Sequence, residues 1–232
     1  MSRVQGVASL PRLTLDVPDV EHYIAVCASS ELRPVPLTPE LSLYAAEDAY
    51  EVWEITTFGT GDAPVPYWSF PWAGGQALAR YVLDHPDLVS GRRVLDLAAG
   101  SGLVAIAAAK AGAATAIAND IDEFAAAAQD LNARANQVTI EPLMRDILDE
   151  SFEADVVLAG DVCYERGLAE RLLAFLQRAA SNGAEVLLAD PGRTYLPREH
   201  LDEVAGYDVP TTLALEGVEM KRTTIWRPRT TG

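Results

Sequence analysis

Hydrophobic residues follow two alternating patterns across the central part of the chain. Short runs rich in valine, leucine and alanine, such as "ADVVLAG" and "AEVLLAD", are typical of strands that are buried on both faces of a sheet. Stretches with helical spacing separate these runs. The pattern predicts strands at 93–98, 114–119, 138–143, 154–160 and 184–190, and helices at 102–111, 122–135 and 166–181. Such alternation predicts an α/β fold: a Rossmann-like, mostly parallel sheet with helices on both faces.

The tail of the chain has a different pattern. "TTLALEGVEM" and "KRTTIWRPR" are two alternating stretches that meet near residues 219–221, and they predict a C-terminal antiparallel hairpin. With this pair, the expected sheet has seven strands.

The segment before the first of these strands divides into two parts. Residues 1–66 mix proline, acids and short apolar pieces, and "RPVPLTP" and "GTGDAPVP" are typical of loops. We interpret this part as a partly loop-like N-terminal extension that could fold over a site. In "GGQALARYVLDHPDLVSG", the spacing of the apolar residues predicts a helix that ends at Pro86. The main α/β domain is therefore expected at 67–232.

Composition and charge narrow the possible partners. At 232 residues and 25.0 kDa, the chain has the length of one sizeable domain. Its formal net charge of −16 disfavours nucleic acid as a partner, because binding to phosphates depends on Lys and Arg. No apolar run approaches the roughly 18 residues that a membrane helix needs, so no membrane partner is expected.

Cysteine usage and the first residues indicate a compartment. Cys27 and Cys163 have neither zinc-site nor disulfide-framework spacing, so we expect no metal and a reducing environment. Together with the absence of a signal-peptide pattern, this favours the cytoplasm. The mitochondrial matrix stays open, because Arg3 and Arg12 lie in an opening stretch without acids.

The stretch "VLDLAAGSGLVAIAAAKAGA" (94–113) leads from a strand through a turn into a helix. Gly100, Gly102 and Ala105 match the dinucleotide-binding form G-x-G-x-x-G/A, and Asp120 lies near the position of a ribose-binding acid. However, five acids are expected at the carboxyl ends of the strands: Asp96, Asp120, Asp146, Asp161 and Asp190. The turn contains no Lys or Arg, and like charges 4 Å apart repel by about 1 kcal/mol even in water. A ligand with cationic groups and ribose hydroxyls fits better than one with phosphates.

The residues "DLAAGSG" (96–102) resemble the first motif of the class I S-adenosylmethionine-dependent methyltransferases, in which an acid precedes a glycine-rich turn and a helix. Ala98 stands where that family usually has its first glycine. The resemblance implies that 67–232 is a class I methyltransferase domain with S-adenosylmethionine as its cofactor. It also implies that this turn, with Ala98, Gly100 and Gly102, borders the cofactor.

The same resemblance implies roles for further residues. Asp96 would receive the amino group of the cofactor, and Asp120 would bind both ribose hydroxyls. Asp146 would lie near the adenine amine, and Ile121 would lie against the adenine ring. Each position also has a simpler interpretation. The glycines suit any tight turn, Asp120 or Asp122 suits a helix N-cap, and Asp146 suits a solvated loop.

A narrower resemblance covers most of the chain. "PYWSFPWAGGQALARYVLDHP", "ANDID", "GDVCY" and "DPGR" are similar to segments of the family-16 protein methyltransferases, and within them of the electron transfer flavoprotein β-subunit lysine methyltransferases. This resemblance implies a protein-lysine N-methyltransferase that acts on that β-subunit. Within the same fold, the alternatives are a ribosomal protein or a small amine such as nicotinamide as the methyl acceptor. Trp72 of the Trp-Ala-Gly-Gly element is a candidate cofactor contact or, equally, an aromatic anchor for its loop.

Asp161 and Tyr164 form an Asp-x-x-Tyr element directly after a predicted strand. Methyl transfer to an amine needs a neutral nitrogen whose lone pair faces the methyl group, so the enzyme mainly has to orient the amine. A carboxylate and a phenol can accept hydrogen bonds from that amine. We therefore expect Asp161 to orient it, with a role as general base left open. A turn Asp beside a packed Tyr, and an ion pair between Asp190 and Arg193, are the structural alternatives in this region.

Two functions of other classes are also compatible with the fold. An NAD-linked oxidoreductase would ordinarily supply a proton-transfer pair such as Tyr-x-x-x-Lys, which this sequence lacks. A non-catalytic binding domain would retain the fold without transferring a methyl group.

Overall fold

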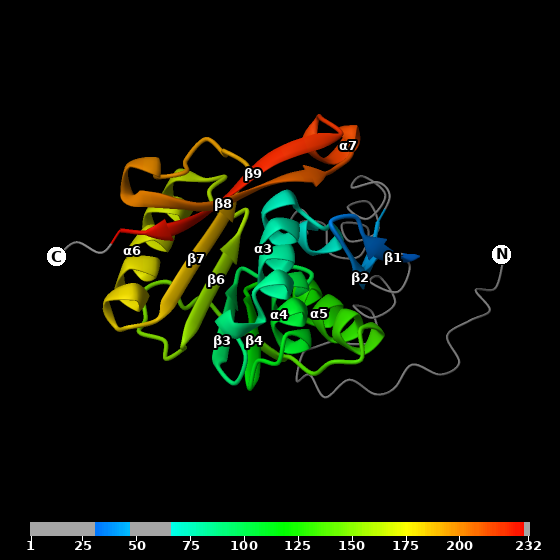
Figure 1. The fold of residues 1–232 in the computed structure, drawn as a ribbon, viewed down its shortest axis with the longest axis horizontal. Coiled ribbons are helices and arrows are strands. Elements are labelled where there is room, and N and C mark those ends of the chain that lie inside the picture. Colours follow the sequence, from blue (N-terminus) through cyan, green and yellow to red (C-terminus); the bar gives the residue numbers. More distant parts are fainter. Residues whose placement is uncertain (1–30, 47–65, 230–232) are drawn as a thin grey trace.

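A seven-stranded sheet forms the centre of the protein, a computed structural model of which describes residues 31–46 and 66–229 (Figure 1). Its strands are β3 (Arg93–Leu97), β4 (Thr115–Asp120), β5 (Glu141–Met144), β6 (Val156–Gly160), β7 (Glu185–Asp190), β8 (Leu201–Pro210) and β9 (Met220–Pro228). Their order is β5-β4-β3-β6-β7-β9-β8. The first five strands in this order pair in parallel, and β9 pairs antiparallel with both β7 and β8. The predicted fold class is confirmed.

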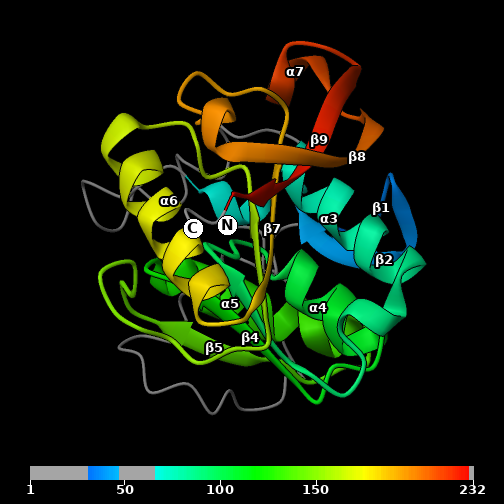
Figure 2. The same ribbon diagram turned by 60° about the vertical axis from the view of Figure 1, so that its left-hand side comes forward.

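Helices cover both faces of this sheet (Figure 2). They are α3 (Ala73–Asp84), α4 (Leu103–Lys110), α5 (Glu123–Ala135) and α6 (Arg166–Ser181). Side chains of a strand point alternately to opposite faces, so Val94 packs with α3 and α4 whereas its neighbour Leu95 packs with α6. Helix α5 contacts β4, β5 and α4, which places it beside α4. The alanines of α4 and α5 permit this close packing.

The predicted loop "RPVPLTP" (33–39) is wrong. Residues Glu31–Val35 and Thr38–Ala45 form an antiparallel hairpin, β1 and β2, with the turn at 36–37. Its alternating residues Val35, Leu41 and Leu43 are buried, and this alternation outweighs the prolines. Each strand of a two-stranded sheet has an unpaired edge, where proline loses no ladder hydrogen bond. Of "GTGDAPVP", only Pro66 lies within the described residues, so most of the predicted 1–66 extension lies outside them.

The C-terminal hairpin exists as predicted, but its first strand was assigned to the wrong residues. Residues 201–210 form β8, whereas the stretch expected as a strand, 211–220, contains the short helix α7 (Leu213–Glu216). The hydroxyl of Thr212 caps this helix by accepting a hydrogen bond from the backbone N–H of Leu215, and Gly217 ends it with a φ of 71°. These two capping signals outweigh the alternation of apolar residues. The strand predicted at 138–143 is also shorter, because β5 begins only at Glu141.

Three short 3₁₀ helices complete the described elements: η1 (Tyr67–Ser69), η2 (Pro86–Leu88) and η3 (Arg198–His200). The predicted helix before the first parallel strand is confirmed as α3, which ends just before Pro86. Among the described helices, none has the length and apolar character needed to cross a membrane.

Candidate active site

The five acids predicted to share one rim do so. Asp96 lies near the end of β3, Asp120 and Asp190 end β4 and β7, and Asp146 and Asp161 follow β5 and β6. These five strands are neighbours and run in the same direction, so their carboxyl ends meet along one edge. This edge is where doubly wound sheets bind their ligands.

Asp120 holds the turn between β3 and α4. One of its carboxylate oxygens accepts a hydrogen bond from the backbone N–H of Gly100 at 2.8 Å. The other accepts from the N–H groups of Ile121 and Asp122, at 2.8 and 3.1 Å. Asp122, and not Asp120, caps helix α5 through the N–H of Phe124. The helix-cap alternative for Asp120 is therefore wrong, and its carboxylate instead ties together the loops that follow two adjacent strands.

The turn itself depends on left-handed backbone. Gly100 and Gly102 have φ values of 49° and 79°, and Ala98 has a φ of 55°. A Cβ at Gly102 would also lie 3.1 Å from Gln129 of α5, so no side chain fits there without movement. Ala98 thus adopts a conformation that glycine adopts freely, at a cost on the order of 1 kcal/mol. A glycine at this position would avoid that cost.

Two buried amides of α5 support the turn from below, and sequence reasoning missed both. The side-chain N–H groups of Gln129 and Asn132 donate to the carbonyl oxygens of Gly100 and Ser101, at 3.3 and 2.9 Å. The amide oxygen of Asn132 also accepts from the N–H of Tyr44 in β2, at 2.8 Å. The available signal was their position three residues apart on one side of an alanine-rich helix.

Asp96 lies beneath the turn. Its side chain is only 2% exposed, and it accepts a hydrogen bond from the N–H of Ala105 in the first turn of α4, at 3.0 Å. Burial raises the pKa of Asp96 to about 8, against the opposing effect of that hydrogen bond. The described contact is therefore with α4. A direct contact with the cofactor's amino group stays a prediction.

The β4–β5 side of the rim offers an apolar surface next to carboxylates. Ile121 is 72% exposed, although it follows a buried strand, and Met144 at the end of β5 is partly exposed. Asp146 accepts from the N–H of Leu148 and forms an ion pair with Arg171 of α6 at 2.8 Å, and these two contacts lower its pKa. An exposed apolar side chain beside hydrogen-bond acceptors suits an adenine ring and its amine. The turn at 96–102 brings no cation that would hold a phosphate. The donor and acceptor set thus fits S-adenosylmethionine.

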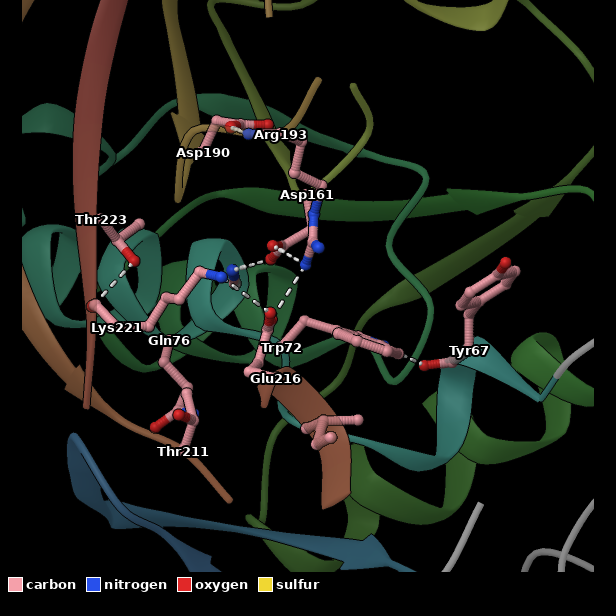
Figure 3. A network of polar contacts seen from close by, with 12 residues as sticks. Tyr67, Trp72, Gln76, Asp161, Asp190, Arg193, Thr211, Glu216, Lys221 and Thr223 are labelled. Atoms are coloured by element: carbon pink, nitrogen blue, oxygen red, sulfur yellow. Dashed lines mark hydrogen bonds and ion pairs between the residues drawn. The ribbon is translucent and has the colours of Figure 1, made fainter. Parts of the chain in front are cut away.

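Asp161 lies on the other side of the rim and is almost enclosed. It is 9% exposed and has a φ of 62°. One carboxylate oxygen accepts from Arg193 at 2.7 Å (Figure 3). The other accepts from the N–H of Gly75 in α3 at 3.0 Å. A Cβ at Gly74 would lie only 2.5 Å from Asp161 Oδ2. The Gly-Gly pair of the Trp-Ala-Gly-Gly element therefore lets α3 begin directly against this carboxylate.

Three aromatic rings pack together beside the loop that carries Asp161. Tyr164 is 47% exposed and stacks on Tyr67, with ring centroids 5.4 Å apart. Trp72 lies next to Tyr67, and its indole N–H donates to the carbonyl oxygen of Tyr67 at 2.7 Å. Trp72 thus anchors the segment before α3 and also faces the site. A contact between Trp72 and the cofactor stays a prediction.

The expected ion pair between Asp190 and Arg193 does not form. One oxygen of Asp190 accepts from the backbone N–H groups of Gly192 and Arg193, at 2.7 and 2.6 Å. The Arg193 guanidinium instead donates to Asp161 and to Glu216 of α7, the latter at 2.9 Å. Gly192, with a φ of 89°, turns the loop so that its backbone wraps Asp190 while the arginine side chain extends toward β6.

Comparison with known proteins gives consistent matches. Residues 56–182 match the family model of the ribosomal protein L11 methyltransferase (PrmA). The chain is 38% identical to an electron transfer flavoprotein β-subunit lysine methyltransferase of Danio rerio over 220 residues, 90% of this chain and 83% of that protein. The corresponding human protein is 37% identical over 199 residues, 82% of this chain and 75% of that protein. A crystal structure of magnesium protoporphyrin IX methyltransferase from Synechocystis with bound S-adenosylmethionine has a TM-score of 0.52. It is 17% identical and covers 80% of this chain and 99% of its own, which supports the fold alone.

Proposed function

The chain belongs to the electron transfer flavoprotein β-subunit lysine methyltransferases, and on this premise we propose that it methylates lysine side chains of that β-subunit. The observation that carries the proposal is the identity of 38% over 90% of the chain. The enzyme is an S-adenosylmethionine-dependent N-methyltransferase. The identity of its acceptor in the cell is what we propose.

We assign the cofactor to the β3–β5 side of the rim. When bound, S-adenosylmethionine supplies a methyl group attached to a positively charged sulfur. The backbone of the turn, from Ala98 to Gly102, would border it, and Asp120 would accept hydrogen bonds from its ribose hydroxyls. The exposed Ile121 would cover one face of the adenine, with Asp146 near the adenine amine. Trp72 and Asp96 complete the proposed set, with Asp96 as the residue that would receive the amino group of the cofactor.

We assign the acceptor lysine to Asp161 and Tyr164. The lysine must lose its proton before its nitrogen can attack, and the oxygens of both residues can then accept its N–H bonds. Burial raises the pKa of Asp161 to about 6, while Arg193 opposes the rise, so the group is mainly ionised at pH 7. An ionised carboxylate attracts the lysine ammonium and orients the neutral amine. Orientation is therefore the proposed main role, and general-base action is the secondary one.

The proposed compartment is a reducing one, the cytoplasm, with the mitochondrial matrix as the alternative. This inference rests on cysteine usage, because Cys163 is buried and free and neither cysteine has zinc-site or disulfide spacing. A protein acceptor also suits the net charge of −16, since a lysine-bearing surface is attracted to an acidic one.

Ribosomal protein L11 is the second candidate acceptor, because the PrmA family model matches residues 56–182. The two candidates are separated by incubating the enzyme and radiolabelled S-adenosylmethionine with purified electron transfer flavoprotein, with purified L11 and with a host lysate. We expect label on the flavoprotein β-subunit, at lysines that mass spectrometry then maps. Label on L11 alone would show that L11, and not the flavoprotein β-subunit, is the acceptor. Cofactor binding without transfer to any protein would favour a binding domain.

A further inference from the structure

Four charged side chains form one continuous chain of contacts behind the acceptor side of the rim (Figure 3). Arg193 Nη2 lies 2.7 Å from Asp161 Oδ1 and 2.9 Å from Glu216 Oε1. Lys221 Nζ then lies 3.7 Å from the other oxygen of Glu216. The Glu216 side chain is only 3% exposed, so the centre of this network is buried, while Lys221 at its end is 30% exposed. Its members come from the β6 end, the β7 loop, α7 and β9.

Arg193 is held at both ends of its side chain. Asp190 fixes its backbone through the N–H group, and the guanidinium carbon lies 5.5 Å from the centre of the Trp72 ring. A planar guanidinium stacked on an aromatic face loses little freedom when it forms hydrogen bonds. With Gly75 holding its second oxygen, the Asp161 carboxylate is fixed in position and in rotation.

We infer that Arg193 and Glu216 are positioning residues for the acceptor lysine: Arg193 keeps the Asp161 carboxylate ionised and oriented, and Glu216 keeps Arg193 between the two carboxylates. This inference rests on the proposed function, because it gives Asp161 the task of receiving the lysine. The inference gives a role in the site to α7, the short helix of the C-terminal hairpin that carries Glu216.

The charges around Asp161 explain why a cation is needed there. Burial raises its pKa to about 6, and the Arg193 charge, the Arg193 hydrogen bond and the Gly75 N–H each oppose that rise. Glu216 raises it further. The thiol of Cys163 also faces this region, with a pKa raised to about 12 first by its burial, so it stays neutral. Arg193 is thus the only cation among the groups that influence Asp161 within the described residues.

Without Arg193, Asp161 and Glu216 would face each other without a cation between them. The pKa of Asp161 would then rise, and the group would be protonated near neutral pH. A protonated carboxyl carries no charge to attract an ammonium and presents one oxygen as a donor. Removal of one opposite charge at this distance typically shifts a carboxyl pKa by about 1 to 3 units.

The test compares the wild type with Arg193→Met and with a matched control, Arg222→Met, which removes an exposed arginine that pairs with exposed Asp208 at 3.4 Å. We measure kcat/KM for the flavoprotein acceptor from pH 5.5 to 9. Because the lysine must be deprotonated, log kcat/KM rises with increasing pH with a slope of one. Below the pKa of Asp161 the slope becomes steeper, and the pH at which the slope changes is the break in the profile. In Arg193→Met, this break should move upward by about 1 to 3 pH units. It should not move in the control.

Two further variants separate positioning from simple structural damage. Arg193→Lys keeps the positive charge but lacks the planar, forked guanidinium group. In this variant the break should return toward its wild-type pH. Glu216→Gln should reduce kcat at pH 7 severalfold while leaving the dissociation constant of S-adenosylmethionine within about twofold. A break that stays in place in Arg193→Met, in a variant that is folded by circular dichroism, would overturn the inference.

A direct titration keeps the inference testable even if the flavoprotein is not the acceptor. Aspartate carboxyl groups labelled with ¹³C are followed by NMR, and the Asp161 signal is assigned by its loss in Asp161→Asn. An upward shift of its midpoint in Arg193→Met supports the inference, and an unchanged midpoint contradicts it. The absence of methyl transfer to the flavoprotein by the wild type contradicts only the proposed function.

Discussion

Asp96 and Asp120 on one side of the acidic rim and Asp161 on the other are held by different kinds of hydrogen-bond donor. On the β3–β4 side, Asp96 and Asp120 receive backbone N–H groups, from Ala105 and from the glycine turn. On the β6–β7 side, Asp161 receives a guanidinium as well as one backbone N–H. Backbone donors fix the shape of a loop, whereas a buried cation also sets the charge of its partner. Asp120 thus fixes the shape of the glycine turn, whereas Asp161 is a buried carboxylate whose pKa is lowered by Arg193 against the effect of burial.

Replacement of Asp161 should have the largest effect, and it should lower turnover far more than cofactor affinity. Asp161→Asn and Asp161→Ala remove the charge that attracts the lysine, so turnover should fall by about 10²- to 10⁴-fold while cofactor affinity stays nearly intact. If orientation alone matters, Asn should retain partial activity and Ala should be worse. If charge or proton acceptance dominates, both should be similarly poor. The measurements are the methylation rate at saturating acceptor and the dissociation constant of S-adenosylmethionine. Near-normal rates in both variants would show that Asp161 is not part of the active site.

Replacement of Asp120 should have the opposite signature. Asp120→Ala removes the proposed acceptor of the ribose hydroxyls and leaves the Gly100 N–H without its partner. Cofactor binding should weaken by about 1.5 to 3 kcal/mol, the range for hydrogen bonds to charged groups. Calorimetry provides the dissociation constant, and circular dichroism checks the fold. An unchanged dissociation constant in a folded variant would reduce Asp120 to a purely structural residue.

Removal of the Asn132 side-chain amide beneath the glycine turn tests how much the stability of the protein depends on the contact between α5 and that turn. Asn132→Ala leaves the Ser101 carbonyl and the Tyr44 N–H without partners, so the free energy of unfolding should fall by about 1 to 3 kcal/mol. Urea denaturation measures this loss. Asn182→Ala, at the exposed end of α6, is the matched control and should change stability far less. Equal losses in both variants would contradict a special role for the buried amide.

The smallest expected effect concerns the left-handed backbone at Ala98. In Ala98→Gly, relief of the left-handed alanine opposes the added freedom of the unfolded chain, about 0.4 to 1 kcal/mol. The net change in unfolding free energy should therefore lie within about 1 kcal/mol and lean toward stabilisation. Ala111→Gly, where φ is −80°, offers no such relief and should destabilise. A clear loss of stability in Ala98→Gly would show that the methyl group of Ala98 makes a contribution of its own.

The parallel part of the sheet was predictable because its strands and helices carry strong, uninterrupted apolar patterns. The two hairpins were less so. In 33–39, buried alternating residues outweighed prolines that sit on strands with free edges, and in 211–220, a capping threonine and a glycine outweighed alternation. Local patterns of this kind do not report which edge of a strand remains unpaired.

The rim acids were predictable from strand ends, but their partners were not. Arg193 pairs with Asp161, 32 residues away in the sequence, and with Glu216 from an unexpected helix. The amides of α5 meet the glycine turn only through the packing of α5 against it. Such contacts depend on tertiary geometry, which spacing along the chain does not encode. The assignments of individual residues to cofactor and acceptor remain predictions.

The insertion of β9 between β7 and β8 has a consequence for synthesis on the ribosome. Asp161 leaves the ribosome long before Glu216 and before the strand that completes the sheet. At about 5 to 20 residues per second, a nascent chain extends for several seconds with the Asp161 loop made and its α7 partner still missing. If Arg193 depends on Glu216 as inferred, a partly made enzyme lacks one of its positioning residues and should methylate the proteins around it more slowly than the finished enzyme does. The order of translation would then favour activity in finished molecules.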